Sequence, residues 1–338
     1  MALRLLELRI PTKDLEKVPA LCEDFGFVDL WTSDTTQDMG LARILLDAGD
    51  TEKLSDRLVR ELGSREGFRM VLLPVEATVP AVEKPAKEDA PAGTESNGRA
   101  APRISRDELY EDLASASEVT TVYVVMVALS TVVAGVGLIR DDVAVIIGAM
   151  VIAPLLGPNM ALSLACTLGH ADLAKRSLKS IAVGVTTAAV LSVLLGILLQ
   201  VDPASPEIAA RTRPGMGDVI LALAAGAAGS LAFTTGVPAI VVGVMVAVAL
   251  LPPLTVAGLL AGAGYTAAAG GALVLVLTNV TCVNLAAVAT FLVQKVRPRT
   301  WWEADRARRA TRAAMVVWAV LLVVLMTLMA LGQIGTSA

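Results

Sequence analysis

The sequence predicts an α+β protein, in which a soluble ferredoxin-like N-terminal domain precedes an all-α polytopic membrane domain of about seven helices. Of the 338 residues, 55% are hydrophobic and 18% are charged. The mean hydropathy of +0.68 lies well above that of ordinary soluble domains. Residues 1–118 carry 15 Lys/Arg against 24 Asp/Glu, whereas residues 119–338 carry 13 against 8. We therefore expect the acidic part to be soluble and the basic part, which holds the long apolar segments, to lie in a membrane.

Residues 1–78 show strand and helix patterns in the order β-α-β-β-α-β. Strands are predicted at LRLLELRIP, FVDLWTS, MGLARILLDAG and FRMVLLPVEA. Thr12 is predicted to cap the first helix, which Gly26 ends, and Thr51 to cap the second, which Gly63 ends. This order is typical of a split β-α-β, ferredoxin-like domain. It contains no recognisable phosphate loop, metal cluster or nucleophile-base pair, so we interpret it as a dimerisation module or a sensor of a small ligand.

Two segments connect this domain to the membrane. Residues 79–103 consist mainly of Pro, Ala, Glu, Lys and Gly, a composition typical of a flexible linker. Residues 104–118 predict a polar helix that leads into the first span, and that lies on the membrane surface or pairs with a second copy. Cysteines occur at 22, 166 and 282 without paired spacing, so we interpret them as reduced packing residues.

Seven apolar segments are long enough to cross a hydrocarbon core of roughly 30 Å. They are Val119–Ile139, Val143–Leu168, Leu178–Val201, Gly217–Gly236, Ala239–Ala261, Ala269–Gln294 and Ala313–Leu331. The basic loop predicted at 296–312 carries, with Lys295 before it, seven Lys/Arg, so the positive-inside rule places it in the cytoplasm. Single crossings, and the lack of a cleavable signal sequence, then predict a cytoplasmic N-terminus and an external C-terminus. A re-entrant segment at 143–168 stays open as an alternative.

An internal repeat divides the membrane domain into halves at 119–201 and 214–295, followed by a final helix at 313–338. A shift of 95 residues aligns Ile146–Gly169 with Val241–Gly264, and eight of 24 positions are then identical. Among the identical pairs are Gly148 with Gly243, Met150 with Met245, and Pro158 with Pro253. Each half holds three spans, so the second half must enter the membrane inverted. A 3+3 inverted repeat with two proline-broken helices is typical of secondary transporters.

The prolines at the two breaks deprive helix carbonyls of their donors. The carbonyls released by Pro154, Pro158, Pro252 and Pro253 are those of Met150, Pro154, Val248 and Ala249. In hydrocarbon such groups persist only beside protein or water, which makes them candidate ligands for a cation or water. Half-helices that restart at Pro158 and Pro253 would instead direct N–H groups at an anion. Alternatively, the prolines only kink the helices, and the breaks form no binding site.

Polar side chains inside the predicted spans are few. Apart from Lys179 and Asp218, which are each the second residue of a span, these segments contain no Asp, Glu, Lys, Arg or His, and this argues against a proton-coupled carrier. A cluster on the sixth span comprises Thr278, Asn279, Thr281 and Asn284, and serves either as ligands or as interhelical hydrogen bonds. The predicted solute or ion site comprises Met150, Pro154, Gly157, Pro158, Asn159, Ser163, Val248, Ala249, Pro252, Pro253, Thr255, Thr278 and Asn279.

Three segments carry a resemblance to a known family. VIIGAMVIAPLLGPNMALSLACTLG, VGVMVAVALLPPLTVAG and LTNVTCVNLAAVATFLV resemble the signature segments of the hydrophobic membrane proteins grouped as domain of unknown function 389. The resemblance covers roughly residues 119–295 and implies an integral membrane architecture without naming a substrate. Family members usually have Ser before the first proline of the first segment, where this sequence has Ala153, so no role is expected for that hydroxyl.

The leading functional hypothesis is a transporter or channel for a small solute or ion, with its site at the midplane between the broken helices. The alternative is a membrane-anchored sensor or scaffold whose cytoplasmic domain binds a small ligand or partner. An enzyme is not expected, because no constellation of nucleophile, base and metal appears, and neither is a cofactor, a metal or a nucleic-acid partner. The N-terminal fold and the small residues Gly226 and Ser230 predict a homodimer in the cell inner membrane.

Overall fold

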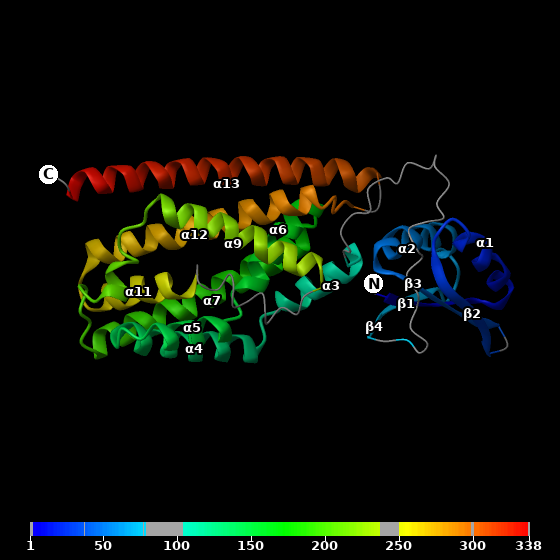
Figure 1. Ribbon diagram of the computed structural model, residues 1–338, viewed down its shortest axis with the longest axis horizontal. Coiled ribbons are helices and arrows are strands. Elements are labelled where there is room, and N and C mark those ends of the chain that lie inside the picture. The colour runs from blue at the N-terminus through cyan, green and yellow to red at the C-terminus, as the bar shows by residue number, and fades with distance from the viewer. Residues whose placement is uncertain are drawn as a thin grey trace, which may run out of the picture. The chain divides into compact units, whose positions relative to one another are not determined.

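The computed structural model describes residues 3–36, 38–76, 78, 104–236, 250–298 and 301–336. The chain divides into two compact units, unit 1 at Met1–Leu109 and unit 2 at Tyr110–Ala338, and each is described by itself (Figure 1). The predicted linker at 79–103 lies outside the described residues, as do Val248 and Ala249 of the predicted site.

Unit 1 contains a four-stranded antiparallel sheet in the order β2-β3-β1-β4. The strands are β1 (Leu3–Pro11), β2 (Phe27–Thr36), β3 (Met39–Asp47) and β4 (Arg69–Val75). The central strands β1 and β3 pair along their whole length, from Leu3 opposite Asp47 to Pro11 opposite Met39. Each helical connection, from β1 to β2 and from β3 to β4, passes over one intervening strand. The four strands predicted from alternating apolar residues are confirmed.

Three helical segments cover one face of this sheet, namely η1 (Thr12–Lys17), α1 (Val18–Cys22) and α2 (Ala48–Leu62) (Figure 1). The core between the two layers is made of fully buried aliphatic side chains, among them Leu6, Ile44 and Leu58. Cys22 belongs to this core, and burial raises the pKa of its thiol to about 11, so the thiol stays protonated at neutral pH. It is free, as are Cys166 and Cys282.

The helix starts in unit 1 differ from the predictions. Thr12 makes no cap, because a 3₁₀ turn follows Pro11, and the α-helix begins only at Val18, where Pro19 falls in the first turn that tolerates it. Asp47, and not Thr51, caps α2, since its carboxylate accepts the N–H of Gly49 at 2.8 Å. The Thr51 hydroxyl instead donates to the carbonyl of Asp47 at 3.1 Å.

Unit 2 is built of helices. They are α4 (Thr121–Ile139), α5 (Val143–Ile152), α6 (Leu156–Leu168), α7 (Ala171–Leu198), α8 (Pro206–Ala209), α9 (Met216–Thr234), α11 (Leu251–Gly262), α12 (Thr266–Val293) and α13 (Trp301–Thr336). The predicted polar helix α3 (Arg106–Ala116) spans the division between the units. Among the described residues, α4, α7, α9, α12 and most of α13 are each long and apolar enough to cross a membrane. The pair α5 and α6 makes a sixth candidate span, so the chain is a multi-pass membrane protein.

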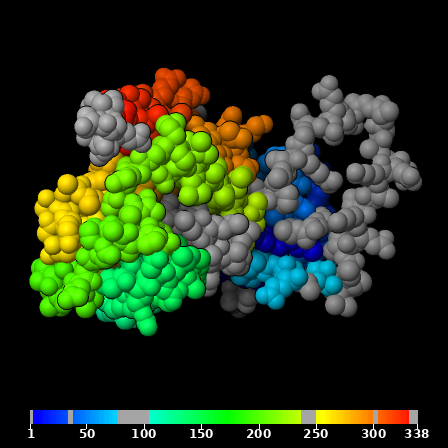
Figure 2. Space-filling view, turned by 60° about the vertical axis from the view of Figure 1, so that its left-hand side comes forward, coloured from blue at the N-terminus to red at the C-terminus, as the bar shows by residue number. Residues whose placement is uncertain are grey.

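The helix α13 corrects one predicted loop. Residues 301–312 are helical and continue directly into the last span, because Ala, Arg and Glu in this stretch favour a helix as strongly as the apolar residues that follow. The helix packs against α6 and α12 and runs along the edge of unit 2 (Figures 1 and 2).

The helices of the two predicted halves pack against one another. The helix α6 contacts α7 and α12, and α11 contacts α12 and α7. Several of these crossings depend on glycine: a Cβ added to Gly196 of α7 would lie 2.1 Å from the carbonyl oxygen of Leu259 on α11. On α9, a Cβ added to Gly226 would lie 2.6 Å from the carbonyl oxygen of Val283 on α12. The small-residue face at Gly226 is therefore occupied by α12 of the same chain.

Candidate functional site

The break between α5 and α6 bends the segment by 51°. The helix α6 begins at Leu156, so the predicted restart at Pro158 is wrong by two residues. The same holds for Pro253, because α11 begins at Leu251. Both prolines lie in the first turn of a helix, where the N–H that proline lacks would have no partner within the helix.

This arrangement weakens the predicted anion site at α11. Pro252 and Pro253 have no N–H group, and the N–H of Leu254 donates to the carbonyl of Leu250 at 3.4 Å. Among the first four residues of α11, this leaves only Leu251 with an N–H group outside that hydrogen bond. A helix N-terminus binds an anion through several converging N–H groups, so α11 is poorly suited to that role.

The two breaks meet in one apolar cluster. Ala153 and Leu155 from the first break and Leu250, Leu251 and Leu254 from the second belong to the same group of buried side chains. The helices α5 and α11 also contact each other. Apolar side chains from the two breaks therefore pack in one cluster.

A polar network lies one turn beyond the first break, between α6 and α12. Asn284 Nδ2 donates to Asn159 Oδ1 at 3.0 Å, and Ser163 Oγ donates to Asn284 Oδ1 at 2.9 Å. Each amide also donates to a carbonyl four residues earlier, since Asn159 Nδ2 donates to Leu155 and Asn284 Nδ2 donates to Val280, each at 2.8 Å. We call Asn159, Ser163 and Asn284 the amide network. All three side chains are buried, so the network is closed to solvent and joins the two predicted halves.

Asn284 completes the network although it belongs to the predicted polar cluster and not to the predicted site. Its partner Asn159 is 125 residues earlier in the chain. The sequence signal for Asn284 is its place in the cluster on the sixth span. The pairing itself depends on the contact between α6 and α12, which no local pattern predicts.

Two other residues of the predicted site, Thr255 and Thr278, form hydrogen bonds within their own helices. The hydroxyl of Thr255 donates to the carbonyl of Leu251 at 3.0 Å, and that of Thr278 donates to Val274 at 2.8 Å. Each therefore satisfies a carbonyl one turn earlier in its own helix. Asn279 is buried on α12.

Two further predicted site residues have packing contacts. Met150 is buried in an apolar cluster together with Ile146 and Val256. Gly157 lies against the end of α3, where an added Cβ would be 2.8 Å from the Cβ of Ala116. Neither of these contacts includes a polar side chain that could bind a solute.

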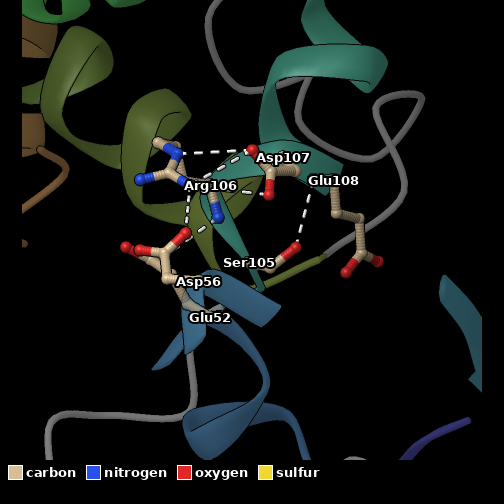
Figure 3. A network of polar contacts seen from close by, with 6 residues as sticks. All are labelled: Glu52, Asp56, Ser105, Arg106, Asp107 and Glu108. Atoms are coloured by element: carbon tan, nitrogen blue, oxygen red, sulfur yellow. Dashed lines mark hydrogen bonds and ion pairs between the residues drawn. The ribbon is translucent and has the colours of Figure 1, made fainter. Parts of the chain in front are cut away.

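A second polar cluster lies at the start of α3, within unit 1 (Figure 3). Arg106 Nη2 donates to Asp56 Oδ1 at 2.9 Å and to Asp107 Oδ1 at 3.3 Å, and the Arg106 backbone N–H donates to Glu52 at 3.2 Å. Burial opposes the charge of Arg106, but the hydrogen bond with Asp56 and the charges of Asp107, Asp56 and Glu52 outweigh burial and raise its pKa. Glu108 accepts from Arg4 at 3.0 Å. These ion pairs hold the first turn of α3 on α2 and β1.

Replacing Arg106 by Met is expected to lower the free energy of unfolding of unit 1 by about 1–3 kcal/mol, because Asp56 and Asp107 lose the buried guanidinium donor that they share. Amide hydrogen exchange at the start of α3 should accelerate, and mass spectrometry can follow it. Arg308→Met is the control, since Arg308 and Asp305 are 72% and 70% exposed and their pair contributes little. Equal exchange in both variants would contradict the prediction.

Comparison with known proteins covers the region of the amide network. Residues 150–285 match a family described as domain of unknown function, DUF389, and this range contains the amide network and both predicted breaks. The chain is also 35% identical over 309 residues to the uncharacterized protein MJ0678 of Methanocaldococcus jannaschii. The aligned region covers 91% of this chain and 92% of that protein. The chain belongs to the DUF389 family. The similarity to MJ0678 extends over both units of this DUF389 protein. No solved structure matches the chain.

Proposed function

We propose that this DUF389 protein is a transporter or channel for a small solute or ion, with its site near the bilayer midplane beside the two breaks. The observation that carries the proposal is reciprocal packing: α6 contacts α12, and α11 contacts α7. The second part of each broken segment thus packs against the third helix of the opposite half. A two-fold axis that exchanges inverted halves pairs their elements in this way, which supports a 3+3 inverted repeat.

The chemistry of α6 also supports a solute pathway. Asn159, Ser163 and Thr167 are each four residues apart, so their polar groups follow one face of the helix. Thr167 extends the face by donating to the carbonyl of Ser163 at 2.9 Å. These groups are neutral, so recognition here would rely on hydrogen bonds and not on a titratable charge. A solute must open the amide network to bind, because the network is closed on itself.

The proposed arrangement has seven spans, with α5 and α6 as the second and α11 completing the fifth. It places the ferredoxin-like unit 1 and the basic start of α13 in the cytoplasm and the C-terminus outside. The cluster of arginines at 306, 308, 309 and 312 supports this orientation by the positive-inside rule.

A flux assay tests the proposal. Purified protein in liposomes is expected to admit at least one probe from a panel of K⁺, Na⁺, chloride, phosphate, glycerol and neutral amino acids, followed by ion-sensitive dyes or vesicle swelling. The Asn159→Leu variant should reduce this flux at least tenfold, because leucine offers no hydrogen bond to the solute.

Thr281→Val is the matched control for the flux assay. Its hydroxyl lies buried on α12 but donates to the carbonyl of Leu277 in the same helix, at 2.7 Å. Flux should therefore persist in this variant. Native protein that moves no probe faster than empty liposomes would contradict the proposed function.

A further inference from the structure

The sheet of unit 1 has one face that its helices leave uncovered. Side chains alternate between the faces of a strand, and Leu6 and Leu8 of β1 are buried under the helices, so Glu7 points to the opposite face. Glu7 lies opposite Arg43 of β3 on one side and opposite Val71 of β4 on the other.

One row of side chains therefore crosses the whole uncovered face. Beyond Arg43 lies Trp31 of β2, so the row reads Trp31, Arg43, Glu7, Val71. Trp31 is 40% exposed and Val71 is 39% exposed. In the centre, Arg43 Nε donates to Glu7 Oε2 at 2.7 Å. The face thus has exposed apolar side chains on both edges and one ion pair in the middle, a pattern that marks an interaction surface.

This row is complementary to a second copy of itself. A two-fold axis that runs parallel to the strands, between β1 and β3, stacks two such faces and reverses the order of the row. Glu7 of each copy then faces Arg43 of the other, and Trp31 of each faces Val71 of the other. The other axis in the plane of the faces, perpendicular to the strands, would stack Glu7 on Glu7 and Arg43 on Arg43. The charges therefore select the first arrangement.

We propose that unit 1 binds a second copy of this chain through this face, with four charges at the centre and a Trp31–Val71 contact on each side. The Glu7 carboxylate favours a second copy over a lipid surface, because lipid would desolvate it without supplying another cation, whereas the second copy supplies Arg43. The area of this face is roughly 450 Å², if each of the four strands contributes seven residues, with about 4.8 Å between strands and a rise of about 3.4 Å per residue. This is below the usual area of about 800 Å² per partner, so confinement in one membrane must assist the contact.

Two charge reversals test the proposal. Glu7→Arg gives the stacked centre four positive charges, and Arg43→Glu gives it four negative charges, so each variant alone should dimerise at least tenfold more weakly. A mixture of the two variants should recover the dimer, because the positive centre of one faces the negative centre of the other. The measurement is single-molecule photobleaching of full-length protein, labelled with a different dye for each variant, in liposomes at rising protein density.

Recovery in the mixture also shows that both variants are folded. The control is an ion pair on the side of the sheet that carries the helices, where Arg57 and Asp24 are 2.5 Å apart. The single variants Asp24→Arg and Arg57→Glu each break this pair and should leave the dimer unchanged. The proposal is overturned if the native chain stays monomeric, if the Glu7 and Arg43 variants dimerise like the native chain, or if their mixture stays monomeric.

Discussion

Asn284→Leu is expected to lower the free energy of unfolding by about 1–3 kcal/mol, because the buried Asn159 Oδ1 loses its donor, while the hydroxyl of Ser163 keeps the carbonyl of Asn159 as an acceptor at 3.1 Å. Leucine is close to asparagine in size, so loss of hydrogen bonds and not a cavity should dominate the effect. Unfolding of the purified protein in detergent, followed by circular dichroism, measures this change.

Thr281→Val provides the comparison on the same helix. It removes a hydroxyl that is as buried as the Asn284 side chain but donates to a carbonyl of α12 itself. The expected decrease in the free energy of unfolding is therefore below about 1 kcal/mol. A double-mutant cycle sharpens the test, since Asn159→Leu and Asn284→Leu act on the same hydrogen bond and should not add. Additive effects would mean that the two side chains do not interact in solution.

Gly196→Ala is expected to have a larger effect, of about 3 kcal/mol or more, and to reduce the yield of folded protein severely. The new methyl group would lie 2.1 Å from the carbonyl oxygen of Leu259, a backbone atom that cannot rotate away. The helices α7 and α11 would have to separate along their whole crossing, which costs the packing of neighbouring residues as well. Fluorescence-detected size-exclusion chromatography of the expressed variant measures the folded fraction.

Gly148→Ala is the control for this substitution. No atom of the described residues lies within 4 Å of a Cβ built at Gly148, in the helix α5, so alanine should change stability by less than about 0.5 kcal/mol or stabilise the helix slightly. Equal yields of the two variants would contradict the close approach of α7 and α11.

Local patterns in the sequence predict most elements because each depends on neighbouring residues. The alternation in β1 predicts a strand that the structure confirms at Leu3–Pro11. The first residue of a helix is harder to predict, because several nearby residues can act as the N-cap. Asp47 and Thr51 both have suitable side chains, but β3 ends where the Asp47 carboxylate reaches the N–H of Gly49. Pro158 marks a break correctly but not its position, since the first turn of a helix accepts proline.

The candidate site was less predictable because it depends on contacts between distant segments. The residues Asn159 and Ser163 beside the first break are predicted from position alone, and both belong to the amide network. Thr255 and Thr278 have the same polar character, yet they turn to carbonyls of their own helices. Sequence pattern does not distinguish a hydroxyl that crosses to another helix from one that folds back, because both lie on apolar helices at similar spacing.

The length of α13 gives a depth scale for the rest of unit 2. From Arg312, the last arginine of this helix, about 20 residues at about 1.5 Å each span a hydrocarbon core of roughly 30 Å, so Arg312 marks the edge of that core. Its neighbour Thr311 donates to the carbonyls of Cys166 at 3.1 Å and Thr167 at 3.4 Å, which puts the end of α6 at the same level. Asn159 lies two turns further along α6, or about 12 Å inward. A spin label at Val320, an exposed residue of α13 that lies eight residues beyond Arg312 and so at about the same depth, should accordingly be relaxed by oxygen, which concentrates at the bilayer centre, more than by a water-soluble nickel chelate.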